Sequence, residues 1–258
     1  MLSYQHIYHA GNLADVHKHG LLAWMIEYLT RKDKPFSYIE THAGRALYDL
    51  NSAEALKTHE AAQGIAKAQD WFPVQHPFRK VQEEVRSEHG PNAYAGSPLL
   101  AARLARPGDA LNLAELHPGE AEALRRALPG VRVHQQDGFS MAHALVPPSP
   151  RRGLMLVDPS YEIKEDYKTI PQHVGKWVRA WNVGVIAVWY PILTSGAHKE
   201  MCAGLQAKAP DALRHEVRFP PARPGHGMVG SGLFVVNPPF GLAEEAARLK
   251  THFDLLKA

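Results

Sequence analysis

The chain has 258 residues, 45% of them hydrophobic, which is enough to bury a full core in one α/β domain with room for an insert. Its formal net charge of +3 and pI of about 8.9 suit a polyanionic partner without requiring one. The single cysteine, Cys202, excludes an intramolecular disulfide and a thiolate zinc site. Because no signal-like apolar core and no apolar run of membrane length occur, we expect a soluble, cytoplasmic protein.

Strand-like and helix-like segments alternate along the chain, which predicts an α/β fold with a mostly parallel sheet covered on both faces. A helix is expected at 12–31, where apolar residues recur at helical spacing. The expected strands, in chain order, are 36–40, 111–116, 131–135, 154–157, 183–189, 213–219 and 232–236. The last two are expected to pair in antiparallel fashion, and further helices are expected at 119–128 and 197–209.

About seventy residues separate the first two strands, too many for a single crossover helix. Ser52 can cap a helix running to about residue 68, and Pro77 can begin another that stops at Gly90. We interpret 49–92 as a small helical insert on a main domain made of 1–48 and 93–258. The crossover helix of the sheet should then begin at 96–98, with Ser97 as its N-cap.

The apolar run 153–157 leads into the tetrad Asp158-Pro159-Ser160-Tyr161. A buried parallel strand that stops before proline places Asp158 at its carboxyl end, where ligands bind in open α/β sheets. The amine of an aromatic base is a poor nucleophile because its lone pair is delocalised into the ring. A carboxylate and a backbone carbonyl that accept its hydrogen bonds, with an aromatic ring to hold the base, favour methyl transfer to it. Asp158, the carbonyl of Pro159 and Tyr161 supply those parts.

A second stretch, Asn237-Pro238-Pro239-Phe240, matches the residue types of such an amine-holding loop more closely. Only eighteen residues follow Phe240, too few for another strand to complete a site. We therefore interpret it as the end of the last strand.

Three further strand ends carry residues suited to a nucleotide-like cofactor. The turn after the first strand contains Gly44, which lets the backbone approach a ligand, although the usual second glycine is absent. Glu115 lies at the end of the second strand and can accept ribose hydroxyls, and the pair Asp137-Gly138 follows the third and can take an adenine amine. The sequence lacks the Gly-x-x-x-x-Gly-Lys-Ser/Thr loop of nucleotide hydrolases.

Sixteen histidines raise the question of a metal site. His17 and His19 lie two positions apart on the first helix and so point about 200° apart, which prevents them from chelating one ion. We expect no metal. Lys18 and His19 can instead face a cofactor carboxylate or a phosphate, and His17 can pack with Trp24 and Tyr28.

Several motifs together resemble the RlmJ family of 23S ribosomal RNA adenine-N6 methyltransferases. They run from the first residue to Asn237-Pro238-Pro239 and so cover nearly the whole chain. They include Tyr4-Gln5-His6, His9-Ala10-Gly11-Asn12, Ala14 to His19, Thr41 to Gly44, Gly96 to Leu99, Glu115 to Pro118, Asp137-Gly138-Phe139, Asp158 to Glu162 and Trp189-Tyr190-Pro191. The departures are Arg45, where glycine is common in the family, and Ser160 in place of the second proline of the tetrad.

The resemblance implies a Rossmann-like class I methyltransferase with a seven-stranded sheet, a helical insert, and S-adenosyl-L-methionine as methyl donor. It implies that Asp158 is the catalytic acid and that Tyr4 and His6 lie against the target base. Lys18 is implied to lie beside both cofactor and substrate. The residues implied to surround the cofactor are His19, His42, Ser97, Glu115, Asp137 and Gly138.

The function we expect is methyl transfer to the N6 amine of one adenine in 23S ribosomal RNA, by a monomer. Two alternatives stay open at this point. One is an adenine methyltransferase that acts on DNA, another RNA or a small amine. The other is a non-catalytic RNA-binding protein on the same fold.

Overall fold

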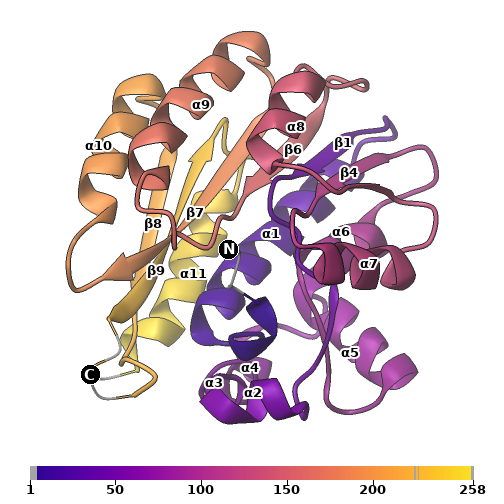
Figure 1. Ribbon diagram of the computed structural model, residues 1–258, viewed down its shortest axis with the longest axis vertical. Coiled ribbons are helices and arrows are strands. Elements are labelled where there is room, and N and C mark those ends of the chain that lie inside the picture. The colour runs from indigo at the N-terminus through magenta and orange to yellow at the C-terminus, as the bar shows by residue number, and fades with distance from the viewer. Residues whose placement is uncertain (1–4, 224, 226, 257–258) are drawn as a thin grey trace.

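A seven-stranded sheet lies between two helical layers (Figure 1). The computed structural model describes residues 5–223, 225 and 227–256. The strand order is β5-β4-β1-β6-β7-β9-β8, in which the first five strands are parallel and β9 is antiparallel to both of its neighbours. The strands are β1 (Ser37–Glu40), β4 (Ala110–Ala114), β5 (Arg132–His134), β6 (Gly153–Val157), β7 (Val185–Leu193), β8 (Leu213–Arg218) and β9 (Met228–Val236). The α/β class and the mostly parallel sheet of seven strands are confirmed.

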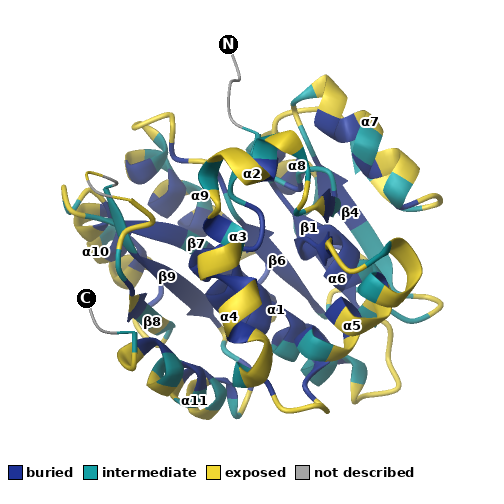
Figure 2. Cartoon of the chain, turned by 90° about the horizontal axis from the view of Figure 1, so that it is seen from below, coloured by how far each residue is buried: buried dark blue, intermediate teal, exposed yellow. Residues whose placement is uncertain are grey.

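Each face of the sheet has its own apolar core, and alternate residues of the central strands point into the two cores. On β6, Leu154 and Leu156 enter the first core, whereas Met155 and Val157 enter the second. The first core is covered by α1 (Leu13–Thr30), α6 (Ser97–Leu104), α7 (Pro118–Ala127) and α11 (Leu242–Asp254). The second is covered by α8 (Gly138–Leu145), α9 (Asp166–Ala180) and α10 (His198–Lys208). Figure 2 shows the strands and α1 as the buried centre of the molecule.

The chain reverses its direction of travel across the sheet between β1 and β6. From β1 it proceeds to β4 and β5, and it then returns to form β6 on the other side of β1. Such a switch point opens a crevice outside the carboxyl ends of the two central strands. Thr41 follows β1 and Asp158 follows β6, so both lie at this crevice.

Helices occupy most of the predicted insert, but not as two long ones. They are α2 (Ala53–Thr58), α3 (Glu60–Gln63), α4 (Ile65–Ala68), the 3-10 turn η2 (Gln69–Trp71) and α5 (Pro77–His89). The single helix expected from Ser52 to residue 68 is wrong, because the left-handed backbone of His59 and the irregular backbone of Gly64 divide it into three. Ile65 and Phe78 join the first core of the sheet, and whether 49–92 is a separate subdomain stays a prediction.

Local details differ from expectation at three other places. A short antiparallel pair, β2 (Leu47–Asp49) and β3 (Ala93–Ala95), brackets the insert and was not predicted. Gly96 is the N-cap of α6, and Ser97 lies inside the helix. β7 extends to Leu193, beyond the expected end at residue 189, because β9 pairs along its whole length.

The pairing of β9 also decides the position of the rival loop at Asn237. Val236, at the end of β9, pairs with Ile186 near the start of β7. Asn237 therefore lies at the sheet edge opposite Asp158, where its side-chain amide donates to the carbonyls of Asn182 and Gly184. No helix within the described part of the chain is long and apolar enough to span a membrane.

Candidate active site

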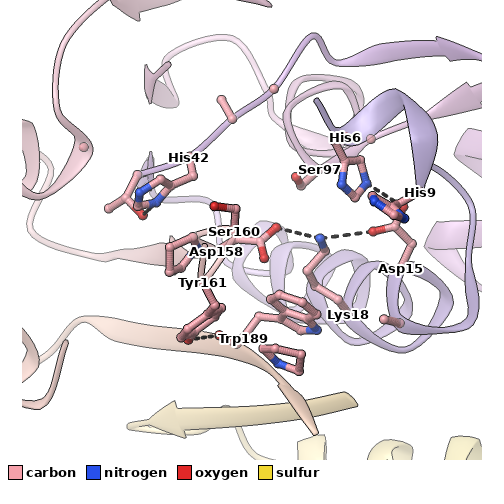
Figure 3. Close-up of a pocket in the computed structure, with 18 of the residues that line it drawn as sticks. His6, His9, Asp15, Lys18, His42, Ser97, Asp158, Ser160, Tyr161 and Trp189 are labelled. Atoms are coloured by element: carbon pink, nitrogen blue, oxygen red, sulfur yellow. Dashed lines mark hydrogen bonds and ion pairs between the residues drawn. The ribbon is translucent and has the colours of Figure 1, made fainter. Parts of the chain in front are cut away.

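A cavity of about 430 Å³ lies at the carboxyl ends of the central strands. That volume is typical of pockets for small ligands. Twelve residues predicted from the sequence line it: His6, Lys18, His19, His42, Gly44, Ser97, Glu115, Asp137, Gly138, Asp158, Pro159 and Tyr161. Tyr4, the remaining predicted residue, lies outside the described residues. The structure thus brings the described predictions together in one place, with Asp158 and Lys18 near its centre (Figure 3).

Lys18 joins two carboxylates at the floor of the cavity. Its ammonium donates to Asp158 Oδ2 at 2.6 Å and lies 3.1 Å from Asp15 Oδ1 (Figure 3). Asp15 also accepts hydrogen bonds from the backbone amide of Gly11 and from Nε2 of His6. These contacts attach the segment before α1 to the loop 158–161 through Asp15 and Lys18.

Burial and pairing act against each other on these charges. Burial opposes the charge of Lys18, but the carboxylates of Asp158 and Asp15 outweigh it and raise the pKa of the ammonium. Burial raises the pKa of Asp158 above its ordinary value, and Lys18 opposes this rise only in part. Because its pKa is raised, Asp158 becomes an anion only at a pH above the usual carboxylate range, and its partner Lys18 remains a cation there.

The tetrad takes a tight turn after β6. Tyr161 has a positive φ of 58°, and its hydroxyl donates at 2.6 Å to the carbonyl of Trp189 on β7. Its ring is only 7% exposed and packs 4.6 Å from the ring of Tyr167. Tyr161 is therefore fixed as a wall of the cavity, and its expected stacking on a base stays a prediction.

The turn after β1 meets the acidic residue that follows β4. Gly44 has a φ of 66°, and its amide donates to Glu115 Oε2 at 2.8 Å. Glu115 Oε1 accepts from the amide of His117, and burial raises the pKa of the carboxyl group. Each carboxylate oxygen keeps a lone pair for a hydroxyl donor. The departure at Arg45 has a structural role, because its guanidinium pairs with Glu120 on α7.

Asp137 and Gly138 form the start of α8. One oxygen of Asp137 caps the helix by accepting from the amide of Ser140 at 2.7 Å. Gly138 lies so close to β1 that an added Cβ would stand 1.8 Å from the carbonyl oxygen of Thr41. Only glycine allows the start of α8 to lie this close to the turn after β1.

Two buried histidines stay neutral at the cavity wall. His19 bonds the hydroxyl of Tyr94 through Nδ1, and its Nε2 has no hydrogen-bond partner within the described chain. Burial lowers the pKa of His19 to about 3 and that of His42 to about 4. Nε2 of His19 is itself buried and lies 3.7 Å from Asp15 Oδ1, so it faces that carboxylate.

Glu40 is a buried acid for which the sequence predicted no role. It is fully buried at the end of β1 and accepts from the hydroxyls of Ser97 at 2.6 Å and Tyr38 at 2.9 Å. Burial raises its pKa to about 8. Ser97, predicted as a helix cap, thus connects the floor of the cavity to this acid.

Comparisons with known proteins match this architecture over most of the chain. The family model "Ribosomal RNA large subunit methyltransferase D, RlmJ" matches residues 33–256. The Ribosomal RNA large subunit methyltransferase J of Escherichia coli (strain K12) is 39% identical over 252 residues, which cover 95% of this chain and 90% of that protein. The chain belongs to the RlmJ family.

Two further relatives agree with this assignment. The Ribosomal RNA large subunit methyltransferase J of Haemophilus influenzae is 37% identical over 250 residues, which cover 94% of this chain and 89% of that protein. The crystal structure of protein LPL1258 from Legionella pneumophila superposes with a TM-score of 0.87 at 34% identity, covering 96% of this chain and 94% of that chain. The resemblance inferred from motifs is therefore confirmed, and the chain is a methyltransferase.

The donor set of the cavity fits the methyl donor that a methyltransferase requires. Glu115 can accept hydrogen bonds from a ribose diol and Asp137 can accept one from an amine, and His19 lines the same cavity. Gly44 and Gly138 line the cavity at places where an added Cβ would clash with Tyr48 and Thr41. Within the described ranges, no group of three or more His, Cys, Asp or Glu side chains is arranged to hold a metal ion.

Sequence reasoning missed two residues that complete the site. Asp15 had a detectable signal, because it lies three positions before Lys18 on a helix, which is the spacing of an ion pair. Trp189, which lines the cavity, was quoted in a motif but given no role. His17 was misplaced as well: it bonds Ser231 and His215, whereas Trp24 and Tyr28 stack on each other.

Proposed function

We propose that the protein transfers a methyl group from S-adenosyl-L-methionine to the N6 amine of one adenine in 23S ribosomal RNA. We infer that it acts as a monomer in the cytoplasm. The observation that carries the proposal is the Lys18–Asp158 pair at the end of β6, beside a cavity whose carboxylates Glu115 and Asp137 can accept hydrogen bonds from a nucleoside. The printed names of the related proteins support ribosomal RNA as the substrate class.

Asp158 orients the amine of the target base. Lys18 holds Oδ2, which leaves Oδ1 and the carbonyl of Pro159 as the two acceptors for the two N–H groups of the amine. Accepting both hydrogen bonds localises the nitrogen lone pair toward the cofactor side. The proton released on methylation passes to Asp158 or through it to water.

The cofactor residues act by positioning. His19 is assigned to the carboxylate of the donor, Glu115 to its ribose, and Asp137 to its adenine amine, with Gly44, His42, Ser97 and Gly138 shaping the walls. The bound sulfonium supplies an already activated methyl group. The residues around it therefore contribute mainly by holding amine and methyl in line.

An adenine inside an RNA helix cannot reach this cavity, so the base must leave its stack. We assign Tyr161 to stacking on the ring of the target base. We assign Tyr4 and His6, in the amino-terminal segment, to contacts with the base as it approaches. His6 is anchored for this by its 2.8 Å hydrogen bond to Asp15.

Mass-spectrometric mapping of ribosomal RNA tests the proposal. Cells that lack the gene should lose one N6-methyladenosine from 23S RNA, and the wild-type gene should restore it while an Asp158→Ala gene should not. An unchanged ribosomal RNA map with altered methylation of DNA or of another RNA would overturn the choice of substrate. Restoration by Asp158→Ala at the wild-type level would overturn the assignment of Asp158.

A further inference from the structure

Trp189 is held from three directions at the edge of the cavity. Its backbone carbonyl accepts the 2.6 Å hydrogen bond of Tyr161, and its indole Nε1 donates to Ser231 Oγ at 2.8 Å. The ammonium of Lys18 stands 5.2 Å from the centre of its ring. Figure 3 shows the indole beside Lys18 and Tyr161, on the cavity side of β7.

Further hydrogen bonds lead from Ser231 away from the cavity. Ser231 Oγ lies 2.9 Å from His17 Nδ1, and His17 Nε2 lies 2.9 Å from His215 Nδ1. Ser231 and His17 are both fully buried. A line of four side chains therefore runs from the cavity wall through β9 and α1 to β8.

The indole fixes the direction of this line, because an indole N–H only donates. Ser231 accepts from it, and its own hydroxyl proton then has His17 Nδ1 as acceptor. His17 donates from Nε2 to His215 Nδ1, so both imidazoles are neutral in this arrangement. Burial lowers the pKa of His17 and lowers that of His215 to about 4, and the nearby charges of Lys250, Glu216 and Asp254 act on His215.

Trp189 also retains exposed surface at the cavity, which Tyr161 and Tyr167 largely lack. The neighbouring rings of Tyr161 and Tyr167 are only 7% and 8% exposed, and they pack on each other. Trp189 is partly exposed and lines the cavity. A flat apolar surface there is the side wall that an extruded base would meet.

We propose that Ser231 and His17 are positioning residues that hold the Trp189 indole in the plane needed to receive the target base. Adjacent residues of α1 thereby serve one site: Lys18 pairs with Asp158 and covers the ring, while His17 fixes the ring through Ser231. The inference rests on the proposed function for the identity of the base. The hydrogen-bond line itself does not depend on it.

Methyl transfer to a 23S RNA fragment tests the link with Ser231→Ala, Trp189→Phe and the double variant. Ser231→Ala should raise KM for the RNA by about three- to tenfold, the worth of one neutral hydrogen bond. In the Trp189→Phe background, the same change should have no further effect, because the indole N–H is already absent. Equal effects of Ser231→Ala in both backgrounds would overturn the inference.

Ser37→Ala is the matched control. Ser37 is fully buried like Ser231, and its hydroxyl donates to the carbonyl of Pro150 at the opposite edge of the sheet. It should lower stability to a similar extent and leave KM for the RNA unchanged. A rise in KM as large as that of Ser231→Ala would mean that general destabilisation explains the effect, and would also overturn the inference.

A spectroscopic measurement separates this inference from the proposed function. The chain has five tryptophans, and in protein labelled with ¹⁵N at tryptophan the Trp189→Phe variant identifies the Trp189 indole resonance. Ser231→Ala and His17→Phe should both shift or broaden that resonance, whereas Ser37→Ala should not. An unmoved resonance would overturn the inference whatever the activity. A wild-type enzyme inactive on 23S RNA would instead overturn the proposed function, and the resonance would still decide the positioning of the indole.

Discussion

The ammonium of Lys18 and the carboxylate of Asp158 form a buried ion pair of 2.6 Å between residues 140 positions apart. The pair joins the helix that precedes the sheet to the loop that follows its central strand. Since Asp15 holds the same ammonium from the other side, the proposed catalytic acid belongs to a network of three charges.

Asp158→Asn should reduce the rate of methyl transfer by about 10²- to 10³-fold. The amide keeps the size of the side chain but loses the charge that orients the amine and receives the proton. Affinity for S-adenosyl-L-methionine should change by less than about threefold, because no cofactor group is assigned to this side chain. Single-turnover methylation and calorimetric titration of the cofactor measure the two effects, and a near-normal rate would contradict the assignment.

Lys18→Met should shift the acidic limb of the activity profile to higher pH. Lys18 is the main group that lowers the pKa of Asp158, so its loss raises that pKa further, and the carboxylate forms only in more alkaline solution. Two buried carboxylates would also lose their partner, at a cost of about 3–5 kcal/mol in the free energy of unfolding. Rates measured from pH 5 to 9 and urea denaturation test both effects.

Lys80→Met is the control for that variant, because Lys80 is exposed on α5. Its pH profile and its stability should match those of the wild type. An unshifted profile for Lys18→Met would show that Asp158 does not titrate in the active enzyme.

Relative to the wild type, the Glu40→Gln variant should become more stable as pH rises. The pKa of Glu40 is raised by burial to about 8 in the folded state, so the folded protein binds a proton that the unfolded chain releases above about pH 4.5. That stabilisation is fully present below pH 4.5 and is lost as pH rises through 8. Over this window, the variant should gain on the wild type by up to about 1.4 kcal/mol per pH unit in the free energy of unfolding.

Urea denaturation of both proteins at pH 5.5, 7 and 8.5 measures that difference. Other titrating groups cancel because they are common to the two proteins. A difference independent of pH would mean that Glu40 is ionised throughout and that its pKa is not raised.

Gly138→Ala should weaken cofactor binding and destabilise the fold by about 1–3 kcal/mol. The added Cβ would stand 1.8 Å from the carbonyl oxygen of Thr41, so either the turn after β1 or the start of α8 must move. Gly119→Ala is the comparison, because the nearest atom to its Cβ is a ring carbon of His117 at 3.3 Å. It should change stability by less than about 1 kcal/mol. Normal cofactor affinity in Gly138→Ala would contradict the close packing of the start of α8 against the turn after β1.

The sequence by itself determined where the site lies along the chain. Glu115, Asp137 and Asp158 each follow an apolar strand, and parallel strands bring their carboxyl ends to one edge. Periodicity and strand ends are local properties of the sequence, so they can be recognised without knowledge of the tertiary contacts. Chain order rejected the loop at Asn237, because only eighteen residues follow Phe240, and the antiparallel direction of β9 is the stronger reason.

Only the tertiary structure decided how the residues of that edge meet. The pairing of Lys18 with Asp158, the burial of Tyr161 against Tyr167, and the line from Trp189 to His17 join segments far apart in the chain. The hydrogen bonds and burial that set these charges and ring planes exist only once α1, β6, β7 and β9 pack together. No local pattern of residue types specifies them, because the same side chains would be solvated and unpaired outside this packing.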